Sequence, residues 1–581
     1  MSAHSAGKRT FAENHHHQHP HHHEKTPKKL RNGFHVYPLK GNPVQTRRTN
    51  DEIHSSIDMG PVVTALVDTP QFQRLRKIKQ LGTAEYVYCN TNHNRWEHSL
   101  GVAALARRMM ERIRTKQPQL PCDGKDVLCV ELAGLLHDVG HGPFSHTFEG
   151  FLKHAQAQFL RERPAYRQYY YVNEAEKNNH TRQQQKWPLR LNVQTWKHEA
   201  VSLAMIDAAL AYLGLAVDLH NLDAPLQQIG DGVDARTMRV FAHGTDHDDD
   251  DALILTSRDW VFIKECIYGG PIAAVHDNNP IVQKLIGRGP DKEWMYDVVS
   301  NGYSGLDVDK MDYFARDQRR AFGTSGQVHI QMIEDCYVAR GYGARPGRDN
   351  AAEARLMICY GEKIEKSAIN FFKERLNLHE SIYRHKTVQA VTYMIQDIFC
   401  LADPFLPISA KNKFGTANGR QGQAKKEYDN LPMSLAVLDT DVFQRLTDSV
   451  IDLIEAKEDV PELDEARALI HRLRRRDLYK CKGMLPISLT KDHPQDHETW
   501  AQSSDQIKYE LLSIAGVHCD QNGLEHRLEA EDFIVEKCSV HHGSNASNPL
   551  NNMRFVQKHD EAALSNSWEN LPLAVEFNKK K

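Results

Sequence analysis

The chain has 581 residues, of which 40% are hydrophobic and 26% charged, and its formal net charge is −3. This composition is ordinary for a globular protein and excludes a wholly disordered or membrane-embedded chain. The small net charge leaves no global field that would attract DNA or anionic lipid. No apolar run reaches the roughly 18–20 residues that span a bilayer, so we expect no membrane contact.

The cysteines and the N-terminus bear on the cell compartment. The ten cysteines are scattered and form no CxxC pair, which is usual for free thiols in a reducing environment. The N-terminal residues lack the apolar stretch of a secretory signal. We therefore expect an intracellular protein, in the nucleus or the cytoplasm.

Residues 1–45 are predicted to form a disordered tail. They contain a histidine-rich tract from His15 to His23, followed by KTPKKLR, and too few large apolar residues to fold alone. The histidines could trap metal ions and the basic residues could serve nuclear import, but a solvated low-complexity segment explains both features.

Residues 46–485 are predicted to form one helical core. Between residues 51 and 401, apolar side chains recur at three- and four-residue spacings, with few alternating runs. The clearest amphipathic helices cover 100–113, 126–139 and 198–213. Polar stretches near 161–195, 244–259 and 411–426 interrupt the pattern and are predicted to be surface insertions.

Residues 486–581 are predicted to form a smaller lobe with regulatory or oligomer-forming contacts. ISLTKDH (487–493) and EDFIVEKCSVHHG (531–543) combine strand-like runs with turn residues. The predicted fold class is therefore mainly α, with an all-helical core and a mixed α/β C-terminal lobe.

The most informative stretch is ELAGLLHDVGHGPFSH (131–146), where an apolar helix runs into His137 and Asp138 and is stopped by glycine and proline. A neutral imidazole beside a carboxylate offers one nitrogen and one oxygen ligand, a mixture that suits iron, manganese or zinc rather than calcium. An isolated His-Asp pair is weak evidence, because helix ends commonly carry a capping Asp and a hydrogen-bonded His.

Two further segments extend this set of ligands. His98 begins an amphipathic helix in NRWEHSLGVAAL (94–105), and Asp309 lies on a helix in LDVDKMDYFARD (306–317), where positions 309, 313 and 317 share a face. A cation held by two imidazoles and two carboxylates keeps open positions, where it lowers the pKa of bound water toward about 7 and binds a phosphoryl oxygen. The order H…HD…D is similar to that of the HD superfamily.

Longer blocks carry a more specific resemblance. They are DTPQFQRLRKIKQLG (68–82), NRWEHSLGVA (94–103), LLHDVGHGPFSH (135–146), KHE (197–199) and DVDKMDYFARD (307–317). In these blocks the chain resembles the SAM-and-HD-domain deoxynucleoside triphosphate triphosphohydrolases. The resemblance covers residues 45–485 and thins beyond them.

The resemblance implies cleavage between the α-phosphate and the 5′ oxygen of a deoxynucleoside triphosphate (dNTP), releasing a deoxynucleoside and inorganic triphosphate. It implies iron, zinc or manganese at the HD site and magnesium bridged through the substrate phosphates. Arg95 and Lys310 would hold those phosphates. The implied metal ligands are His98, His137, Asp138 and Asp309.

Three further imidazoles stand where the family has its catalytic histidines. Proton transfer to the leaving 5′ oxygen needs an acid whose pKa is not far from the working pH, which histidine meets without much tuning. Our favoured acid is His146. His141 and His198 would then bind the α-phosphate and stabilise charge in the transition state.

The resemblance also implies the residues that bind the sugar. Gln80 and Leu81 would lie near the ribose edge, Tyr313 and Asp317 toward the 3′ hydroxyl, and Tyr383 against C2′, where its ring leaves no room for a 2′ hydroxyl. FFKERLNLHESIYRHK (371–386) is predicted to put Arg375, His379 and Tyr383 on one helical face, as the wall of a nucleotide pocket requires.

Family members also bind nucleotides between subunits, so we expect GTP or dNTP activators and a homo-oligomer, from dimer to tetramer. Bound nucleotide would stabilise that assembly by linkage. A guanine-selecting activator site is implied at Asn50, Asp51, Asp68, Gln73 and Arg76. The phosphates of a shared nucleotide would be held by Lys363, Lys386, Arg476 and Lys480, since Arg forks and Lys point charges suit triphosphate oxygens.

The chain departs from the family pattern at several positions. Gly361 and Ser367 stand where Arg and Asn often contact the activator, Arg384 replaces a glutamine and Met311 a tryptophan. These departures leave the activator's identity open. We also expect no SAM domain, because a 45-residue tail is too short for that five-helix module, and a reduced set of oligomer-forming elements after the DFIVE block.

Two other functions stay open. Another HD phosphohydrolase, such as a cyclic-nucleotide phosphodiesterase or an alarmone hydrolase, would keep the metal site but not the QLG, DYFARD and SIYRHK blocks. A non-catalytic nucleotide sensor or single-stranded RNA-binding protein on an HD scaffold would have no need of an intact ligand set.

Overall fold

The computed structural model describes a chain with several gaps. The described residues are 47–153, 170–171, 191–192, 197–229, 239–240, 253–272, 284–323, 329–343, 353–409, 430–485, 487, 500–522, 528–537 and 548–576. The predicted tail at 1–45, the predicted insertion at 411–426 and most of those at 161–195 and 244–259 lie outside them.

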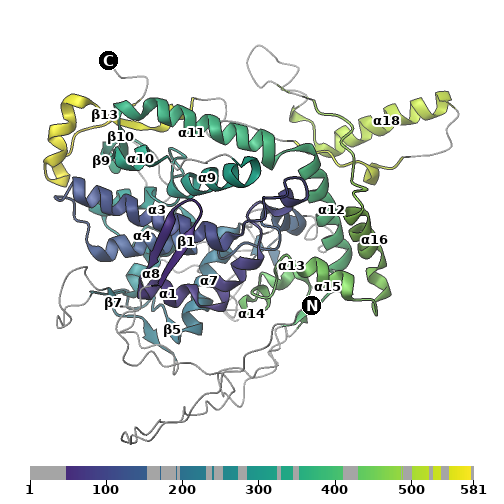
Figure 1. Cartoon of the computed structure of the whole chain (residues 1–581), viewed down its shortest axis with the longest axis horizontal. Helices are drawn as coiled ribbons and strands as arrows, with labels where there is room; N and C mark the ends of the chain where they lie inside the picture. The colour runs from purple at the N-terminus through teal and green to yellow at the C-terminus, as the bar shows by residue number, and fades with distance from the viewer. Residues whose placement is uncertain are drawn as a thin grey trace, which may run out of the picture.

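Most of the described chain is helical, which confirms the predicted mainly-α class (Figure 1). The helices up to residue 322 are α1 (Pro61–Val67), α2 (Pro70–Gln73), α3 (Arg95–Lys116), α4 (Gly124–Leu136), α7 (His198–Tyr212), α8 (Ser257–Tyr268) and α9 (Val308–Phe322). Those that follow are α10 (Ile330–Glu334), α11 (Glu365–Leu378), α12 (Lys386–Ala402), α13 (Met433–Ala436), α14 (Thr440–Phe443), α15 (Val450–Ala456), α16 (Asp464–Arg474) and α18 (Ser504–Asn522).

The pair α3 and α4 forms the centre of the core. Asn94 caps α3, since its side chain accepts backbone N–H bonds from the first turn while Glu97 returns a bond to the Asn94 N–H. Asp123 and Asp126 cap α4 in the same way. At Gly134 the helices touch, because a Cβ there would lie 3.1 Å from a backbone carbonyl oxygen of α3. This contact fixes the two helix ends that carry the predicted metal ligands.

A four-stranded sheet lies beside α10 and α11 (Figure 1). Its order is β14 (Val575–Glu576), β13 (Arg554–Val556), β10 (Arg355–Gly361) and β9 (Cys336–Gly341). β10 runs antiparallel to β9 and parallel to β13. Every residue of β10 is buried, and a fully buried strand cannot be told from a buried helix by periodicity. The C-terminal residues thus complete a sheet whose other two strands lie in the range that we expected to be all-helical.

Short antiparallel pairs close several loops. The pairs are β1 (Arg47–Asp51) with β2 (Ser55–Met59), β5 (Leu215–Ala216) with β6 (Gln227–Gln228), β7 (Arg239–Val240) with β8 (Leu253–Ile254), and β11 (Ile408–Ser409) with β12 (Asn430–Leu431), while β3 (Tyr170–Tyr171) and β4 (Leu191–Asn192) pair in parallel. β7–β8 and β11–β12 pair the chain on either side of segments 241–252 and 410–429. The predicted insertion at 244–259 ends earlier than expected, because α8 begins at Ser257 with Thr256 as its cap.

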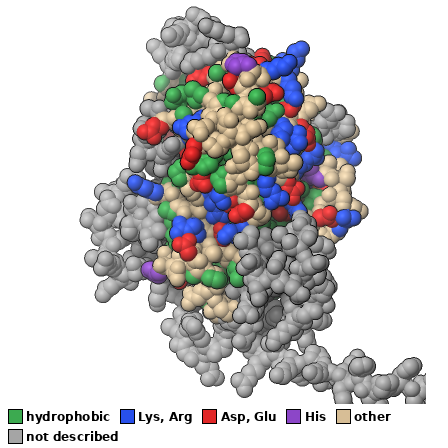
Figure 2. Space-filling view, turned by 90° about the vertical axis from the view of Figure 1, so that its left-hand side faces the viewer, with side chains coloured by type: hydrophobic (Ala, Val, Ile, Leu, Met, Phe, Trp, Pro, Cys, Tyr) green, Lys and Arg blue, Asp and Glu red, His purple; other side chains and the backbone are tan. Residues whose placement is uncertain are grey.

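One continuous set of buried apolar side chains runs from Ile57 to Leu571 and joins the helices to the sheet. By contrast, α18 has no buried side chain and projects from the body (Figure 1). In the part of the chain that the structure describes, no helix combines the length and apolarity needed to cross a membrane. Figure 2 shows acidic and basic side chains interspersed over the described part of one face, in keeping with the small net charge.

A buried ion pair ties the sheet to the helices. Arg355 of β10 donates to the carboxylate of Asp297 at 2.9 Å, and both side chains are at most 3% exposed. Breaking such a pair from one side leaves an uncompensated buried charge, which costs about 3–5 kcal/mol.

Asp297→Ala is therefore expected to lower the free energy of unfolding by about 3–5 kcal/mol, measured by denaturant titration. The matched control is Asp58→Ala, which removes an exposed carboxylate paired with Arg48 and should cause no measurable change. Equal effects of the two substitutions would contradict the assignment.

Candidate metal centre and active site

The four predicted metal ligands meet between α3, α9 and the loop that follows α4. Ligand atoms of His98, His137 and Asp138 all lie within 4.8 Å of one another. Asp309 Oδ1 lies 3.1 Å from His98 Nε2 and 3.4 Å from His137 Nε2. The Asp138 carboxylate lies 3.5 Å and 3.4 Å from the same two nitrogens. Two imidazole nitrogens and two carboxylates therefore face one point.

Hydrogen bonds on the far side of each ring set the tautomer. Nδ1 of His98 lies 2.7 Å from Asp312 Oδ2, and Nδ1 of His137 lies 2.7 Å from the Gly134 carbonyl oxygen. Because these acceptors hold one ring proton on Nδ1, each Nε2 faces the carboxylates and offers a lone pair to a metal that displaces its proton. His137 Nε2 is buried and makes no hydrogen bond of good geometry. Such a set of N and O donors fits a divalent transition metal.

The charges around the predicted metal ligands stabilise a positive charge at the site. Burial disfavours the imidazolium of His98, but hydrogen bonds to Asp309 and Asp312 outweigh it and raise the pKa of His98 to about 10. Burial likewise opposes ionisation of Asp138 and Asp309, yet neighbouring cations and imidazoles hold the pKa of each carboxyl well below its usual range. The site therefore keeps both carboxylates ionised and attracts a cation.

A chain of buried charges continues outward from His98. Asp312 accepts from Arg316 at 2.9 Å and contacts His54 at 2.5 Å, and Arg316 in turn donates to Asp51 at 2.8 Å. The sequence analysis did not single out Asp312, although it lies one helical turn after Asp309. Asp51, which was predicted to contact an activator, has its carboxylate engaged in this network.

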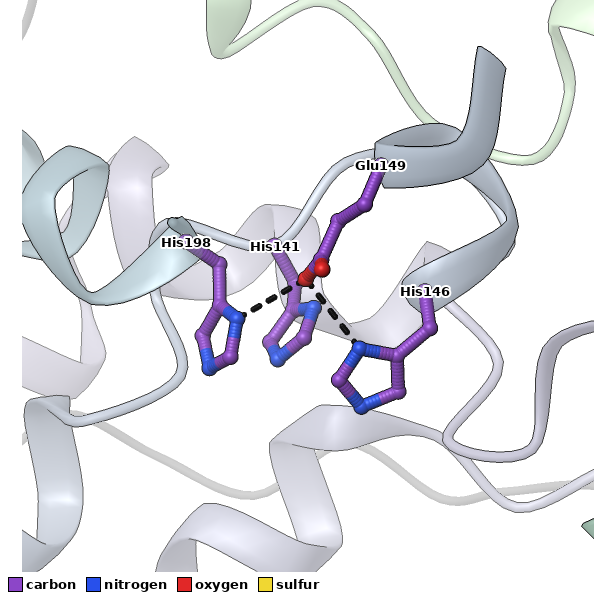
Figure 3. Close-up of side chains that lie close together, drawn as sticks. All are labelled: His141, His146, Glu149 and His198. Carbon is purple, nitrogen blue, oxygen red and sulfur yellow. Dashed lines mark hydrogen bonds and ion pairs between the residues drawn. The ribbon is translucent and has the colours of Figure 1, made fainter. Parts of the chain in front are cut away.

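A second cluster adjoins the first and contains the three predicted catalytic histidines (Figure 3). His141 Nε2 lies 3.3 Å from Asp138 Oδ1, and its ring stacks on that of His198 with 3.7 Å between centroids. Glu149 Oε1 lies 2.9 Å from Nδ1 of His198 and 3.1 Å from Nδ1 of His146. One carboxylate thus orients two imidazoles. Glu149 escaped the sequence analysis, although it follows His146 by one turn.

These histidines differ in electrostatic environment. Burial, together with the charges of Arg95 and His198, holds the pKa of His141 well below its ordinary value. Burial also acts against the charged form of His198, but the hydrogen bond that His198 donates to Glu149, together with the nearby carboxylates, outweighs it and raises the pKa of His198. His146 has a side chain that is 69% exposed. The cluster therefore combines an imidazole that favours its neutral form, one whose charged form is favoured, and one that is accessible.

The predicted phosphate-binding cations lie at the edge of this site. Arg95 is buried, donates through Nε to Ser145 Oγ at 2.8 Å and forms an ion pair with Asp138. Lys310 Nζ lies 2.8 Å from Asp307. Both cations are thus engaged by partners of this chain.

The predicted sugar-binding residues form a connected group. Asp317 accepts from the Tyr383 hydroxyl at 2.7 Å and lies 2.8 Å from His93, and the Tyr313 ring lies 6.3 Å from that of His98. The expected common face of 371–386 is altered by a π-helical turn at residues 379–383, within which the His379 and Tyr383 rings stand 4.9 Å apart. Arg375 precedes this turn on α11.

The segment before α3 holds two further predicted residues. Gln80 is buried, and its side-chain oxygen has no hydrogen-bond partner within the described chain. Leu81 packs against the core from a half-buried position. A buried amide oxygen without a partner is costly unless a ligand or water pairs with it.

The predicted activator residues near the N-terminus are grouped around α2. Asp68 forms a two-pronged ion pair with Arg47, with both distances 2.7 Å. Gln73 donates to a backbone carbonyl at 2.7 Å and accepts from Arg76 at 2.9 Å. Asn50 is exposed on β1. Asp68, Gln73 and Arg76 therefore lie close together.

The residues predicted to hold the phosphates of a shared nucleotide lie on several other elements. Lys363 lies 2.8 Å from Asp335, whereas Lys386 and Lys480 are exposed. Arg476 follows α16, has a left-handed backbone with φ of 63° and donates to the Tyr86 carbonyl. Of the departures from the family pattern, Met311 is fully buried in the core.

Comparisons with known proteins agree with this geometry. Residues 95–207 match the HD domain family. Over 88% of its length the chain is 31% identical to the deoxynucleoside triphosphate triphosphohydrolase SAMHD1 of Bos taurus, 69% of which it covers. This chain belongs to the SAMHD1 family. It is also 32% identical to the Danio rerio protein of that name and 26% identical to the SAMHD1 homolog of Dictyostelium discoideum, covering 65% and 71% of them.

Membership of the SAMHD1 family confirms the resemblance that the five sequence blocks predicted. The HD match begins at Arg95 and includes His98, His137 and Asp138, while Asp309 lies beyond it. The chain spans 65% of the length of the Danio rerio and Mus musculus relatives.

The hydrogen bond that His98 donates to Asp312 should strengthen metal binding. Asp312→Asn is expected to lower affinity for a divalent metal about 10–100-fold, because the amide offers one uncharged acceptor oxygen in place of two charged ones and fixes the ring tautomer less firmly. Competition with a chelator measures this affinity. The matched control is Asp317→Asn, a buried carboxyl of the same helix that does not touch a predicted ligand. Wild-type affinity in Asp312→Asn would exclude the orienting role.

Proposed function

We propose that this protein is a metal-dependent dNTP triphosphohydrolase, which releases a deoxynucleoside and inorganic triphosphate. The observation that carries the proposal is the convergence of four distant side chains, two imidazoles and two ionised carboxylates, beside three further histidines. The relatives are named dNTP triphosphohydrolases, which supplies the substrate class of the proposal.

His98, His137, Asp138 and Asp309 would hold the metal, which we propose to be iron, zinc or manganese. When bound, a divalent cation supplies a Lewis acid for phosphoryl oxygens and lowers the pKa of water. We further propose that magnesium enters with the phosphates of the substrate. Arg95 and Lys310 would hold those phosphates by exchanging carboxylate contacts for phosphate contacts, which Arg and Lys form readily.

The histidine cluster would carry the proton to the leaving group. In the proposed step the oxygen of water bonds to the α-phosphorus, the bond to the 5′ oxygen breaks, and one water proton passes to solvent. His146 donates a proton from Nε2 to the departing 5′ oxygen, while its Nδ1–H donates to Glu149. His198 as a cation and His141 as a neutral donor would stabilise charge on the α-phosphate.

Selection of a deoxyribose would depend on the wall formed by α9 and the π-helical turn. The hydrogen bond between Tyr383 and Asp317 fixes the phenol ring in place. A rigid ring next to C2′ excludes a 2′ hydroxyl by volume, and Gln80 offers its buried, unpartnered oxygen to the sugar. Leu81, Tyr313, Arg375 and His379 would complete the pocket.

The first test uses the purified chain, each dNTP and product analysis. Asp309→Ala and His137→Ala are each expected to abolish triphosphate release, because each removes one donor from the centre. The control is Asp459→Asn, an exposed carboxylate away from both clusters, which should keep wild-type activity. Wild-type rates in either metal-site variant would defeat the assignment. Release of a nucleoside monophosphate or pyrophosphate would indicate another HD phosphohydrolase.

We also propose that GTP or dNTP activators bind between subunits and assemble a homotetramer. The polar surface around Asp68, Gln73 and Arg76 would recognise the base, and the exposed Lys363, Lys386 and Lys480, with Arg476, would hold phosphates. Such binding stabilises the assembled state in proportion to ligand concentration. Binding of single-stranded nucleic acid and a nuclear or cytoplasmic location stay predictions.

Arg476→Glu is expected to prevent nucleotide-dependent assembly, because it replaces a phosphate partner by a like charge. Light scattering with and without GTP measures the assembly state. Lys457→Glu makes the same charge change at an exposed position just after α15 and should assemble as the wild type does. Assembly of Arg476→Glu at wild-type nucleotide concentrations would contradict the proposed clamp.

A further inference from the structure

A half-buried carboxylate outside both clusters joins two segments of the active site. Asp448, just before α15, accepts the Phe144 N–H at 2.6 Å through Oδ1 and the Lys79 N–H at 2.8 Å through Oδ2. Its own backbone N–H donates to the Lys77 carbonyl at 3.1 Å. Phe144 lies in the loop that carries His141 and leads to His146, where the chain becomes helical. Lys79 directly precedes Gln80 and Leu81.

These two segments also touch each other directly. Ser145 Oγ donates to the Lys79 carbonyl at 2.6 Å. Gly82 has a φ of +52°, and a Cβ there would lie only 2.5 Å from the Phe144 carbonyl oxygen. The segments therefore meet backbone to backbone, and a small displacement of either is transmitted to the other.

The histidine loop needs external support in this conformation. Phe144 and Ser145 both have left-handed backbones, with φ of 54° and 57°, and neither is glycine. Residues in that region persist only where their surroundings hold them. Asp448 binds the amide of the first of them. Arg74 adds a second tie, donating to the carbonyls of Val139 at 3.0 Å and Leu446 at 2.9 Å.

We propose that Asp448 is a positioning residue whose ionised carboxylate holds the loop of His141 and His146 against the Lys79–Leu81 segment. It would thereby set the distance between the proton donor and the sugar-binding residues. The proposal rests on the proposed function, which assigns those roles. No substrate or metal contact is required of Asp448.

The clamp depends on the charge of the carboxyl group. Both oxygens accept an N–H only in the carboxylate, since a protonated carboxyl would turn its O–H toward a backbone N–H. Burial raises the pKa of Asp448 to about 7, opposed by its two backbone hydrogen bonds, while Glu85 raises it and Lys79 lowers it. Arg74 and Tyr86 also lie within its electrostatic reach. The clamp is therefore complete above about pH 7 and is lost below it.

Asp448→Asn tests this role with little change of shape. The amide accepts one N–H but presents its own NH2 to the other, so it imitates the protonated state at every pH. At pH 8, kcat is expected to fall roughly ten- to hundredfold, the scale of a small misplacement of catalytic groups. Part of the fall in wild-type kcat at acidic pH should come from protonation of Asp448. This part should be absent from the pH profile of Asp448→Asn. Asp459→Asn, with an exposed side chain, should keep the wild-type profile.

Hydrogen exchange gives a readout that needs no activity. After correction for intrinsic rates, wild-type amides in 79–82 and 142–147 should exchange faster at pH 6 than at pH 8, and Asp448→Asn should show fast exchange at both. The wild-type comparison stands even if the variant does not fold. Metal content should equal that of wild type.

Three results would overturn the proposal: an unchanged pH profile in a well-folded Asp448→Asn, equal wild-type protection at both pH values, or loss of metal in proportion to activity. If wild type releases no triphosphate, the proposed function fails. The exchange data would still report on the clamp, so the two failures can be told apart.

Discussion

The arrangement depends on one constraint: two ionised carboxylates and two imidazole lone pairs are directed at the same point inside the protein. Left to themselves these groups repel one another and lose hydration, so the surrounding structure must hold them together. The close contact of α3 and α4 at Gly134 fixes the two histidines, and α9 brings Asp309 against them. A cation is the group that best compensates such a set.

Many of the buried polar side chains form hydrogen-bond networks that hold the metal ligands and histidines in place. Asp312 fixes His98, Arg316 neutralises Asp312, and Asp51 completes the charge balance at the β1–β2 hairpin. On the opposite side Glu149 orients two histidines, and Asp448 supports the loop from which one of them projects. The side chains that face the metal ligands or the substrate are thus held by others farther out. Most of these supporting groups are carboxylates that accept hydrogen bonds from N–H donors.

Sequence reasoning identified the four ligands and three histidines because each stands in a contiguous block with a recognisable neighbour. It failed where the deciding contact crosses the chain. Asp312 and Glu149 lie one turn from predicted residues, but nothing local distinguishes them from ordinary helix carboxylates. Asp448 lies 304 positions from Phe144, its hydrogen-bond partner. β10 was missed because a strand covered on both faces has no alternating pattern.

The sequence by itself determined the helical class, the order of the ligand blocks and the family, because helix periodicity and short motifs are local properties. Only the tertiary structure decided which nitrogen of each histidine faces the centre, that Arg95 and Asp51 are already paired, and that the half-buried carboxylate of Asp448 links the histidine loop to the Lys79–Leu81 segment. Those facts follow from packing between distant segments, where burial strengthens each charge interaction and removes water as an alternative partner.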